Sequence, residues 1–232
     1  MFKYFLTFFL ILSLSSPIQA IESNSSNNTE NNFTKALEFI DKKNYKSAFK
    51  LLKPLAKNGH GGSQYLLGSF YYNGIGISKN NKKALEWIML SIESGNTETR
   101  LDALYTIGKL HTQLVMGDGI VQDYVEAAKW FAIAAQEGHV LSQYQLAIFY
   151  EEGRRGIYEK EGILRNIKIA DSFYHLAANS GYDIAQYRLG LIYEYLDSED
   201  GRVQDYTESV KWYSKAAQQG NYKAQRNLGY LY

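Results

Sequence analysis

The stretch DYVEAAKWFAIAAQEGH, Asp123 to His139, returns in nearly the same form as DYTESVKWYSKAAQQGN, Asp205 to Asn221. Each copy begins with Asp, whose side chain can accept a hydrogen bond from a free N–H group at a helix start. The next-to-last residue of each copy is a glycine, which takes the left-handed conformation that closes many helices. Between them, small and large apolar residues recur three apart on one helical face. The stretch therefore predicts a short amphipathic helix that this chain uses more than once.

The same frame occurs five times when the chain is aligned on itself, and the glycines that close it are 36 to 43 residues apart. This period is typical of stacked helical repeats. A second frame, small-Gln-Tyr-x-Leu-Gly-x-x-Tyr, comes before each later copy and predicts a first helix that packs against the second. The caps are Asn44, Asn80, Asp123, Asn166 and Asp205; the small residues are Ala48, Ala84, Ala127, Ala170 and Ser209; the large packing anchors are Leu51, Trp87, Trp130, Phe173 and Trp212; the glycines are Gly59, Gly95, Gly138, Gly181 and Gly220.

The motifs AxYxLGxxY and DYxxAxxWYxxAAxxG resemble the Sel-one-like repeat family, relatives of the tetratricopeptide repeats, over residues 44–232. The resemblance implies an all-α, right-handed superhelical solenoid of antiparallel helix pairs that holds other proteins. Secreted members of the family carry cysteine bridges inside their repeats. This chain has no cysteine, so its stability must come from packing alone. The expected units are a leading pair at 33–60, repeats at 61–96, 97–139, 140–182 and 183–222, and a partial repeat or cap at 223–232.

The N-terminal residues predict export. Lys3 is followed by the apolar run YFLTFFLILSL, and Ala20 supplies the small residue of a cleavage site, so residues 1–20 are predicted to be a signal peptide. The alternative is a membrane anchor, for which the run is short. Residues 21–32 are rich in Asn and Ser and predict a disordered linker. We expect a bacterial protein that is periplasmic or secreted and that has no membrane anchor after cleavage.

The linker also holds three acceptor sequons for N-glycosylation, at Asn24, Asn27 and Asn32. They would be occupied only in a host that glycosylates exported proteins. A lumenal adaptor of a eukaryotic secretory pathway is therefore an alternative to a bacterial envelope protein.

Composition argues against several function classes. The net charge of +1 provides no overall positive field to recruit nucleic acid. The absence of cysteine excludes disulfides, thiol nucleophiles and cysteine metal sites. The four histidines show neither i, i+4 ligand spacing nor a His-Glu-x-x-His motif. We therefore expect no metal and no cofactor.

One enzymatic alternative rests on SAFK, Ser47 to Lys50, which matches the Ser-x-x-Lys motif of penicillin-recognising serine enzymes. Some relatives of the Sel-one-like family have been linked to β-lactam binding. However, the match lies where the repeat requires an ordinary helix, and the chain has neither Ser-Asp-Asn nor Lys-Thr-Gly. A repeat that leaves no slot for catalysis favours a protein that is not an enzyme.

Two features are candidates for binding a protein or peptide partner. The tyrosines of the first-helix frame could line the inner surface, where tyrosines make adaptable contacts; the alternative is packing between repeats. The loop from Glu151 to Arg165 is the longest inside a repeat and carries two arginines; the alternative is a tolerated surface insertion. The candidate residues are Tyr65, Tyr105, Tyr144, Tyr187, Arg154 and Arg155.

Overall fold

The structure, a computed structural model, describes residues 17–113, 120–154, 162–195 and 202–231. In this part of the chain eleven helices follow one another, and an isolated β-bridge joins Arg154 to Ile163. The predicted all-α solenoid is confirmed. The helices are α1 Pro17–Asp41, α2 Tyr45–Lys57, α3 Gly61–Asn73, α4 Asn81–Glu93, α5 Arg100–Thr112, α6 Tyr124–Gln136, α7 Val140–Glu152, α8 Ile167–Asn179, α9 Asp183–Glu194, α10 Tyr206–Gln218 and α11 Tyr222–Leu231.

The ends of the second helices follow from local chemistry, as predicted. The side chain of each of the five Asn or Asp caps accepts a hydrogen bond from a backbone N–H of the first turn, as Asp123 does from Glu126 at 2.7 Å. The five closing glycines all have φ between +74° and +92°, a conformation that other residues adopt only with strain.

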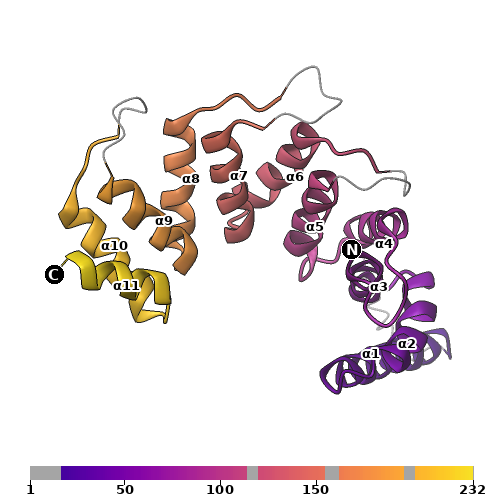
Figure 1. The fold of residues 1–232 in the computed structure, drawn as a ribbon. Coiled ribbons are helices and arrows are strands. Elements are labelled where there is room, and N and C mark those ends of the chain that lie inside the picture. The colour runs from indigo at the N-terminus through magenta and orange to yellow at the C-terminus, as the bar shows by residue number, and fades with distance from the viewer. Residues whose placement is uncertain (1–16, 114–119, 155–161, 196–201, 232) are drawn as a thin grey trace, which may run out of the picture.

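Each helix packs chiefly against its neighbours in sequence, which builds an arch (Figure 1). The helix pairs are α1–α2, α3–α4, α5–α6, α7–α8 and α9–α10, and α11 packs on α10. In the middle of the arch the first helices, α5, α7 and α9, lie on its inner side, and their partners lie outside (Figure 1). The inner surface is therefore built from successive repeats.

In the second helix of each repeat the most deeply buried large residue lies one position after the predicted anchor, and of the predicted anchors only Trp212 is itself buried in the core. Trp130, for example, is half-buried, whereas the next residue, Phe131, is completely buried. Positions i and i+4 share a helix face as i and i+3 do. The residue four positions after the small residue points at the glycine of the first helix. A Cβ added at Gly108 would lie 2.5 Å from the Phe131 ring, so the glycine creates the space for the anchor. The buried anchors are Leu52, Ile88, Phe131, Tyr174 and Tyr213.

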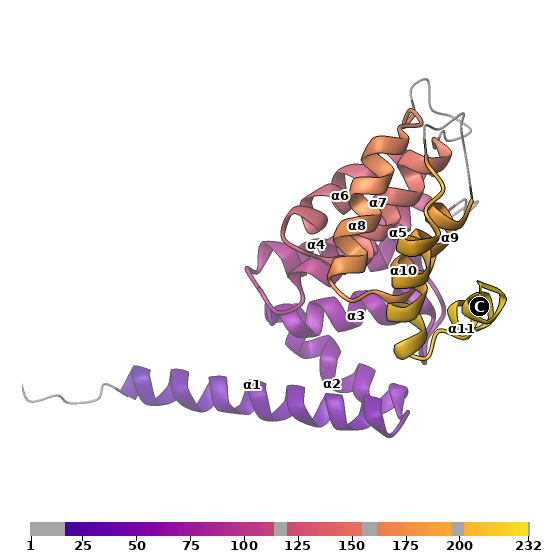
Figure 2. The same cartoon turned by 90° about the vertical axis from the view of Figure 1, so that its left-hand side faces the viewer.

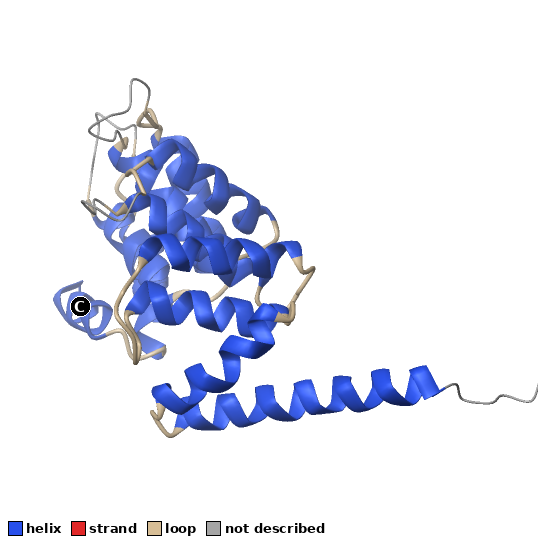
Figure 3. Ribbon diagram, turned by 90° about the vertical axis from the view of Figure 1, so that its right-hand side faces the viewer, coloured by secondary structure: helices blue, strands red, loops and turns tan. Residues whose placement is uncertain are grey.

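The N-terminal segment differs from the sequence prediction. Residues 21–32, expected to be a disordered linker, are helical and belong to α1, which projects past α2 (Figures 2 and 3). The C-terminal part of α1 is held by Ala36, which is fully buried, and by Phe33, whose ring meets His60 edge-on. Once that part is helical, adding residues upstream costs less than starting a helix.

The signal peptide prediction falls mostly on residues 1–16, which lie outside the described residues. None of the helices that the structure describes is long and apolar enough to cross a bilayer. Cleavage before Ile21 stays a prediction.

Candidate peptide-binding groove

The four candidate tyrosines are half-buried and act first as packing residues. Tyr105 contacts Phe131 of its own repeat and His139 at the start of the next, with ring centroids 5.6 and 5.2 Å apart. Tyr144 makes the equivalent contacts with Tyr174 and Tyr182. Burial raises the pKa of the Tyr105 and Tyr144 hydroxyls, which stay protonated at neutral pH. These contacts agree with the packing alternative.

Two of these tyrosines also line an open cavity of about 480 Å³ on the inner side of the C-terminal repeats. Its walls come from α7, α9, α11 and the turn before α11. A neighbouring cavity of about 280 Å³ shares Arg188 and Leu191 with it, so the two form one depression, which we call the C-terminal groove. Its lining residues are Tyr144, Glu151, Asp183, Ile184, Tyr187, Arg188, Leu191, Ile192, Tyr195, Arg202, Gly220, Asn221, Tyr222 and Lys223.

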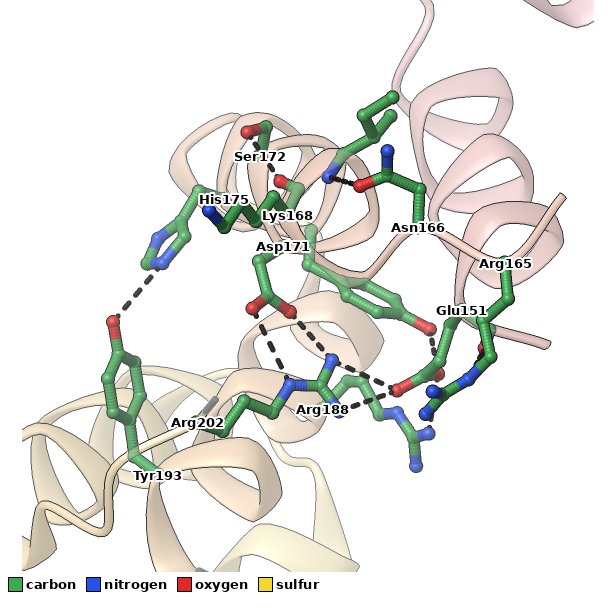
Figure 4. Close-up of polar contacts among 12 residues, drawn as sticks. Glu151, Arg165, Asn166, Lys168, Asp171, Ser172, His175, Arg188, Tyr193 and Arg202 are labelled. Carbon is green, nitrogen blue, oxygen red and sulfur yellow. Dashed lines mark hydrogen bonds and ion pairs between the residues drawn. The ribbon is translucent and has the colours of Figure 1, made fainter. Parts of the chain in front are cut away.

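A buried ionic network forms one end of the groove (Figure 4). The Glu151 carboxylate accepts hydrogen bonds from the Tyr174 hydroxyl at 2.7 Å and from Arg188 at 2.6 Å. Arg202 donates to the same carboxylate at 3.2 Å and to Asp171 at 2.7 Å. Only 10% of the Glu151 side chain and 12% of the Arg202 side chain are exposed. The network therefore fixes the orientation of Arg188, whose side chain is 40% exposed at the groove surface.

The charge state of this network follows from its contacts. Burial alone would raise the pKa of Glu151, but the hydrogen bonds from Tyr174 and Arg188 and the charges of both arginines hold it below its ordinary value. Burial and the adjacent carboxylate raise the pKa of the Tyr174 hydroxyl. At neutral pH Glu151 is thus an anion that accepts from a neutral tyrosine and two cations.

The open part of the groove offers mixed chemistry. Tyr222 is 69% exposed and presents an aromatic face with a polar tip. Lys223 is exposed, and Asp183 accepts a hydrogen bond from Asn221 at 2.8 Å. Apolar side chains, hydrogen-bonding groups and charges of either sign can therefore find partners along it.

Arg154 of the longest loop is not among the residues that line this groove. Arg154 pairs with Glu152, its guanidinium lies 5.6 Å from the centre of the Tyr124 ring, and its backbone pairs with Ile163. Arg155 lies outside the described residues. The loop also begins later than predicted, because α7 continues to Glu152 and so carries Glu151 in a helix.

The residues of the enzymatic alternative lie at ordinary helix positions. Ser47 is in the first turn of α2, where its backbone N–H donates to Asn44 at 3.3 Å. Lys50 is exposed on the same helix. Among the residues that the structure describes, no three His, Asp or Glu side chains are grouped so as to hold a metal ion.

The ionic network was missed by sequence reasoning, although a signal for it exists. The two repeats whose buried anchor is a tyrosine, Tyr174 and Tyr213, also have a glutamate seven residues after the first-helix tyrosine, Glu151 and Glu194. The other repeats have Tyr72 and Thr112 there. The paired occurrence indicates a hydrogen bond between the two positions, which the structure has in both repeats.

Comparison with known proteins places this fold in a family. The sequence model of the Sel1 repeat family matches residues 38–60, 62–96, 114–139, 140–182, 183–221 and 223–232. No curated protein sequence matches the chain significantly.

Solved structures show the same architecture. A protective antigen of uropathogenic Escherichia coli with an SLR fold superposes with a TM-score of 0.71 at 28% identity, over 92% of this chain and 44% of that one. A Sel1 repeat protein of Oxalobacter formigenes gives 0.61 at 30% identity, over 80% and 49%. A putative Sel1 repeat protein of Klebsiella pneumoniae, at 14% identity, shares the fold, with a TM-score of 0.52 over 89% and 94%. The chain thus spans about half the length of the first two.

Sel1 repeats are generally scaffolds for protein–protein interactions and form a non-catalytic repeat fold. The caps, the closing glycines and the paired helices of this chain are the features on which that fold is built. The chain belongs to the Sel1 repeat family.

Proposed function

We propose that this protein is an exported scaffold that binds a peptide segment of a partner protein in the C-terminal groove. The observation that carries the proposal is that the groove spans several repeats. Its walls come from α7, α9 and α11 and so from three successive repeats. A partner lying along the groove would contact all three at once, which is how solenoids use their inner surfaces.

The chemistry of the groove supports a peptide as ligand. Tyr187 and Tyr222 provide aromatic surface, and tyrosine is enriched among the residues that dominate binding energy. Arg188 is held in place by Glu151 before any ligand arrives, so less side-chain entropy is lost on binding.

The test compares two triple variants that alter only exposed residues and so leave the core intact. The groove variant is Ile184→Ser, Tyr222→Ala and Lys223→Ala. The matched control, Leu176→Ser, Tyr206→Ala and Lys215→Ala, lies on α8 and α10. Each is used beside the unaltered chain to capture partners from host extract. A photo-crosslinking residue replaces Tyr195, an exposed groove residue that neither variant alters. We expect the captured partner to be lost from the groove variant and kept by the control.

Retention by the groove variant with loss from the control would place binding on the outer face and refute the groove. Crosslinked peptides that map to the partner would identify the bound segment.

The export part of the proposal rests on Lys3, the apolar run after it and Ala20. The bacterial origin of the similar solved structures agrees with a bacterial envelope or secreted protein. Mass spectrometry of the protein isolated from the organism that produces it should find Ile21 as the first residue, in the fraction outside the cytoplasm. An intact Met1 in the cytoplasm would refute export, and sugars on Asn24, Asn27 or Asn32 would favour the eukaryotic alternative.

A further inference from the structure

Four lysines form a single row on α2. Lys46, Lys50, Lys53 and Lys57 are spaced i, i+4, i+7 and i+11, which places them within a sector of about 60° on a helix with 3.6 residues per turn. The buried residues of the same helix, among them Ala48 and Leu52, lie on the opposite side. All four lysines are exposed, and α2 contains no acidic residue. We call this row the α2 lysine row.

The α2 lysine row has no counter-charge in the described structure. The ion pairs of this region are Lys42 with Glu38 and His60 with Glu30, and neither involves the row. Lys53 lies 5.9 Å from the centre of the Phe49 ring, and its ammonium group stays exposed to solvent. Four like charges along one face repel one another, so nothing within this helix explains the row.

The repeat architecture does not require these lysines. The second helix of each repeat has the same four positions, counted from its cap. Only α2 has a basic residue at all four of them. In α6, for example, the positions hold one lysine, Lys129, beside two small apolar residues and a glutamine. The positions hold Lys82, Glu86, Met89 and Glu93 in α4; Val125, Lys129, Ala132 and Gln136 in α6; Lys168, Ser172, His175 and Asn179 in α8; and Thr207, Lys211, Ser214 and Gln218 in α10.

The row is the centre of a wider charge asymmetry. Residues 35–83 contain ten lysines and only two acidic residues, Glu38 and Asp41, whereas the whole chain has a net charge of only +1. The remainder of the chain is therefore acidic. An anionic surface would attract the α1–α2 end of the arch and repel the rest, which favours one orientation of the molecule.

We propose that the α2 lysine row binds an anionic membrane surface and so fixes the N-terminal end of the solenoid against a bilayer. Each lysine near an anionic lipid surface contributes roughly 1 kcal/mol. A row of lysines on the outer side of a helix, without arginine or exposed aromatic groups, is unlike a protein interface, where Lys is depleted and Arg, Tyr and Trp are enriched. The row leaves the C-terminal groove free, so membrane attachment and peptide binding are independent.

The test is co-sedimentation of the full chain with vesicles of phosphatidylcholine alone or mixed with phosphatidylglycerol. The variant carries Lys46→Gln, Lys50→Gln, Lys53→Gln and Lys57→Gln; the control loses the same charge through Lys129→Gln, Lys168→Gln, Lys211→Gln and Lys215→Gln. All eight side chains are exposed, so circular dichroism should show both variants folded. The apolar run near the N-terminus is common to all the proteins and contributes equally.

We expect the unaltered chain and the control to bind the mixed vesicles more tightly than the neutral ones, with an affinity that falls as salt rises. The variant should bind the mixed vesicles about 10² to 10³ times more weakly. A fourfold Lys→Arg variant should keep the binding. Equal binding of the variant and the control would overturn the proposal, as would row-dependent binding of duplex DNA that is tighter than vesicle binding.

Discussion

The α7–α8 and α9–α10 repeats each have a buried tyrosine at the equivalent position, but the charges around the two tyrosines differ. In both, the tyrosine hydroxyl donates to a glutamate near the end of the first helix, Tyr174 to Glu151 and Tyr213 to Glu194. The Glu151 carboxylate also accepts hydrogen bonds from two arginines, Arg188 and Arg202. In the second repeat the described structure gives Glu194 no arginine, and the tyrosine hydroxyl accepts instead from Asn227 of α11. The repeat frame thus sets the tyrosine–glutamate pair, and residues outside the frame decide whether it becomes an ionic network.

Removing the glutamate should separate the two repeats most strongly. Glu151→Ala leaves two arginines without their shared carboxylate, and breaking a buried ionic network in this way costs about 3 kcal/mol of unfolding free energy. Glu194→Ala removes one hydrogen bond and should cost about 1 kcal/mol. Urea unfolding of both variants gives the comparison. Equal losses would show that the arginines do not stabilise the α7–α8 repeat.

A methyl group placed against the anchor should have the next largest effect. A Cβ at Gly190 would lie 2.3 Å from the Tyr213 ring, so Gly190→Ala should cost about 2 kcal/mol through overpacking. The slot is occupied by Ala147 beside Tyr174 in the other repeat, which already accommodates a methyl group. Gly229→Ala on α11 is the control, because its added Cβ meets nothing within 4 Å. If thermal unfolding finds both variants as stable as the unaltered chain, the helix pair adjusts its spacing freely.

Acid should weaken the α7–α8 repeat through Glu151. Its pKa is lowered in the folded chain from the ordinary value of 4.5, so the unfolded chain binds the proton first as pH falls. The stability from Glu151 is therefore present above about pH 4.5 and is lost as pH falls through the lowered folded value. Glu151→Gln should flatten the decline of unfolding free energy in that range, measured by urea unfolding at a series of pH values. An unchanged slope would show that Glu151 does not cause the loss of stability in acid. Glu194→Gln makes the same change in the α9–α10 repeat and serves as the comparison.

The smallest effect is expected at the link from the α9–α10 repeat to α11. Asn227 donates to the Tyr213 hydroxyl at 2.9 Å and is 8% exposed. Asn227→Ala should cost about 1 kcal/mol, which corresponds to a decrease in Tm of about 2–4 °C for a chain of this size. Arg226→Ala, on the exposed side of the same helix, should leave the Tm unchanged. A decrease of the same size in both would show that the hydrogen bond is not the cause.

The sequence predicts the parts of this fold that depend on neighbouring residues. Caps such as Asp123 and closing glycines such as Gly138 act within one turn of helix, so their roles can be read from residue type and spacing. The anchor predicted at Trp130 lies at Phe131, because both residues are large and only the packing of the first helix selects between them.

The groove depends on contacts that no local pattern contains. Arg202 reaches Glu151 from the far end of a loop whose length varies among the repeats. The loop predicted from Glu151 to Arg165 starts directly after Tyr150, the last residue of the first-helix frame, whereas α7 continues to Glu152. Tyr144 and Tyr187 both pack between helices and line the groove, and this double role depends on the curvature of the arch.

The bond between Arg202 and Glu151 has a consequence for how the molecule folds and opens. It joins residues 51 positions apart, whereas helices elsewhere contact chiefly their sequence neighbours. Such local contacts favour rapid folding and let a solenoid unravel one repeat at a time. The long-range bond ties α7, α8 and the segment before α10 into a single cooperative unit. In native-state hydrogen exchange, amides of α7 and α8 should therefore open together, while α1 to α6 exchange repeat by repeat.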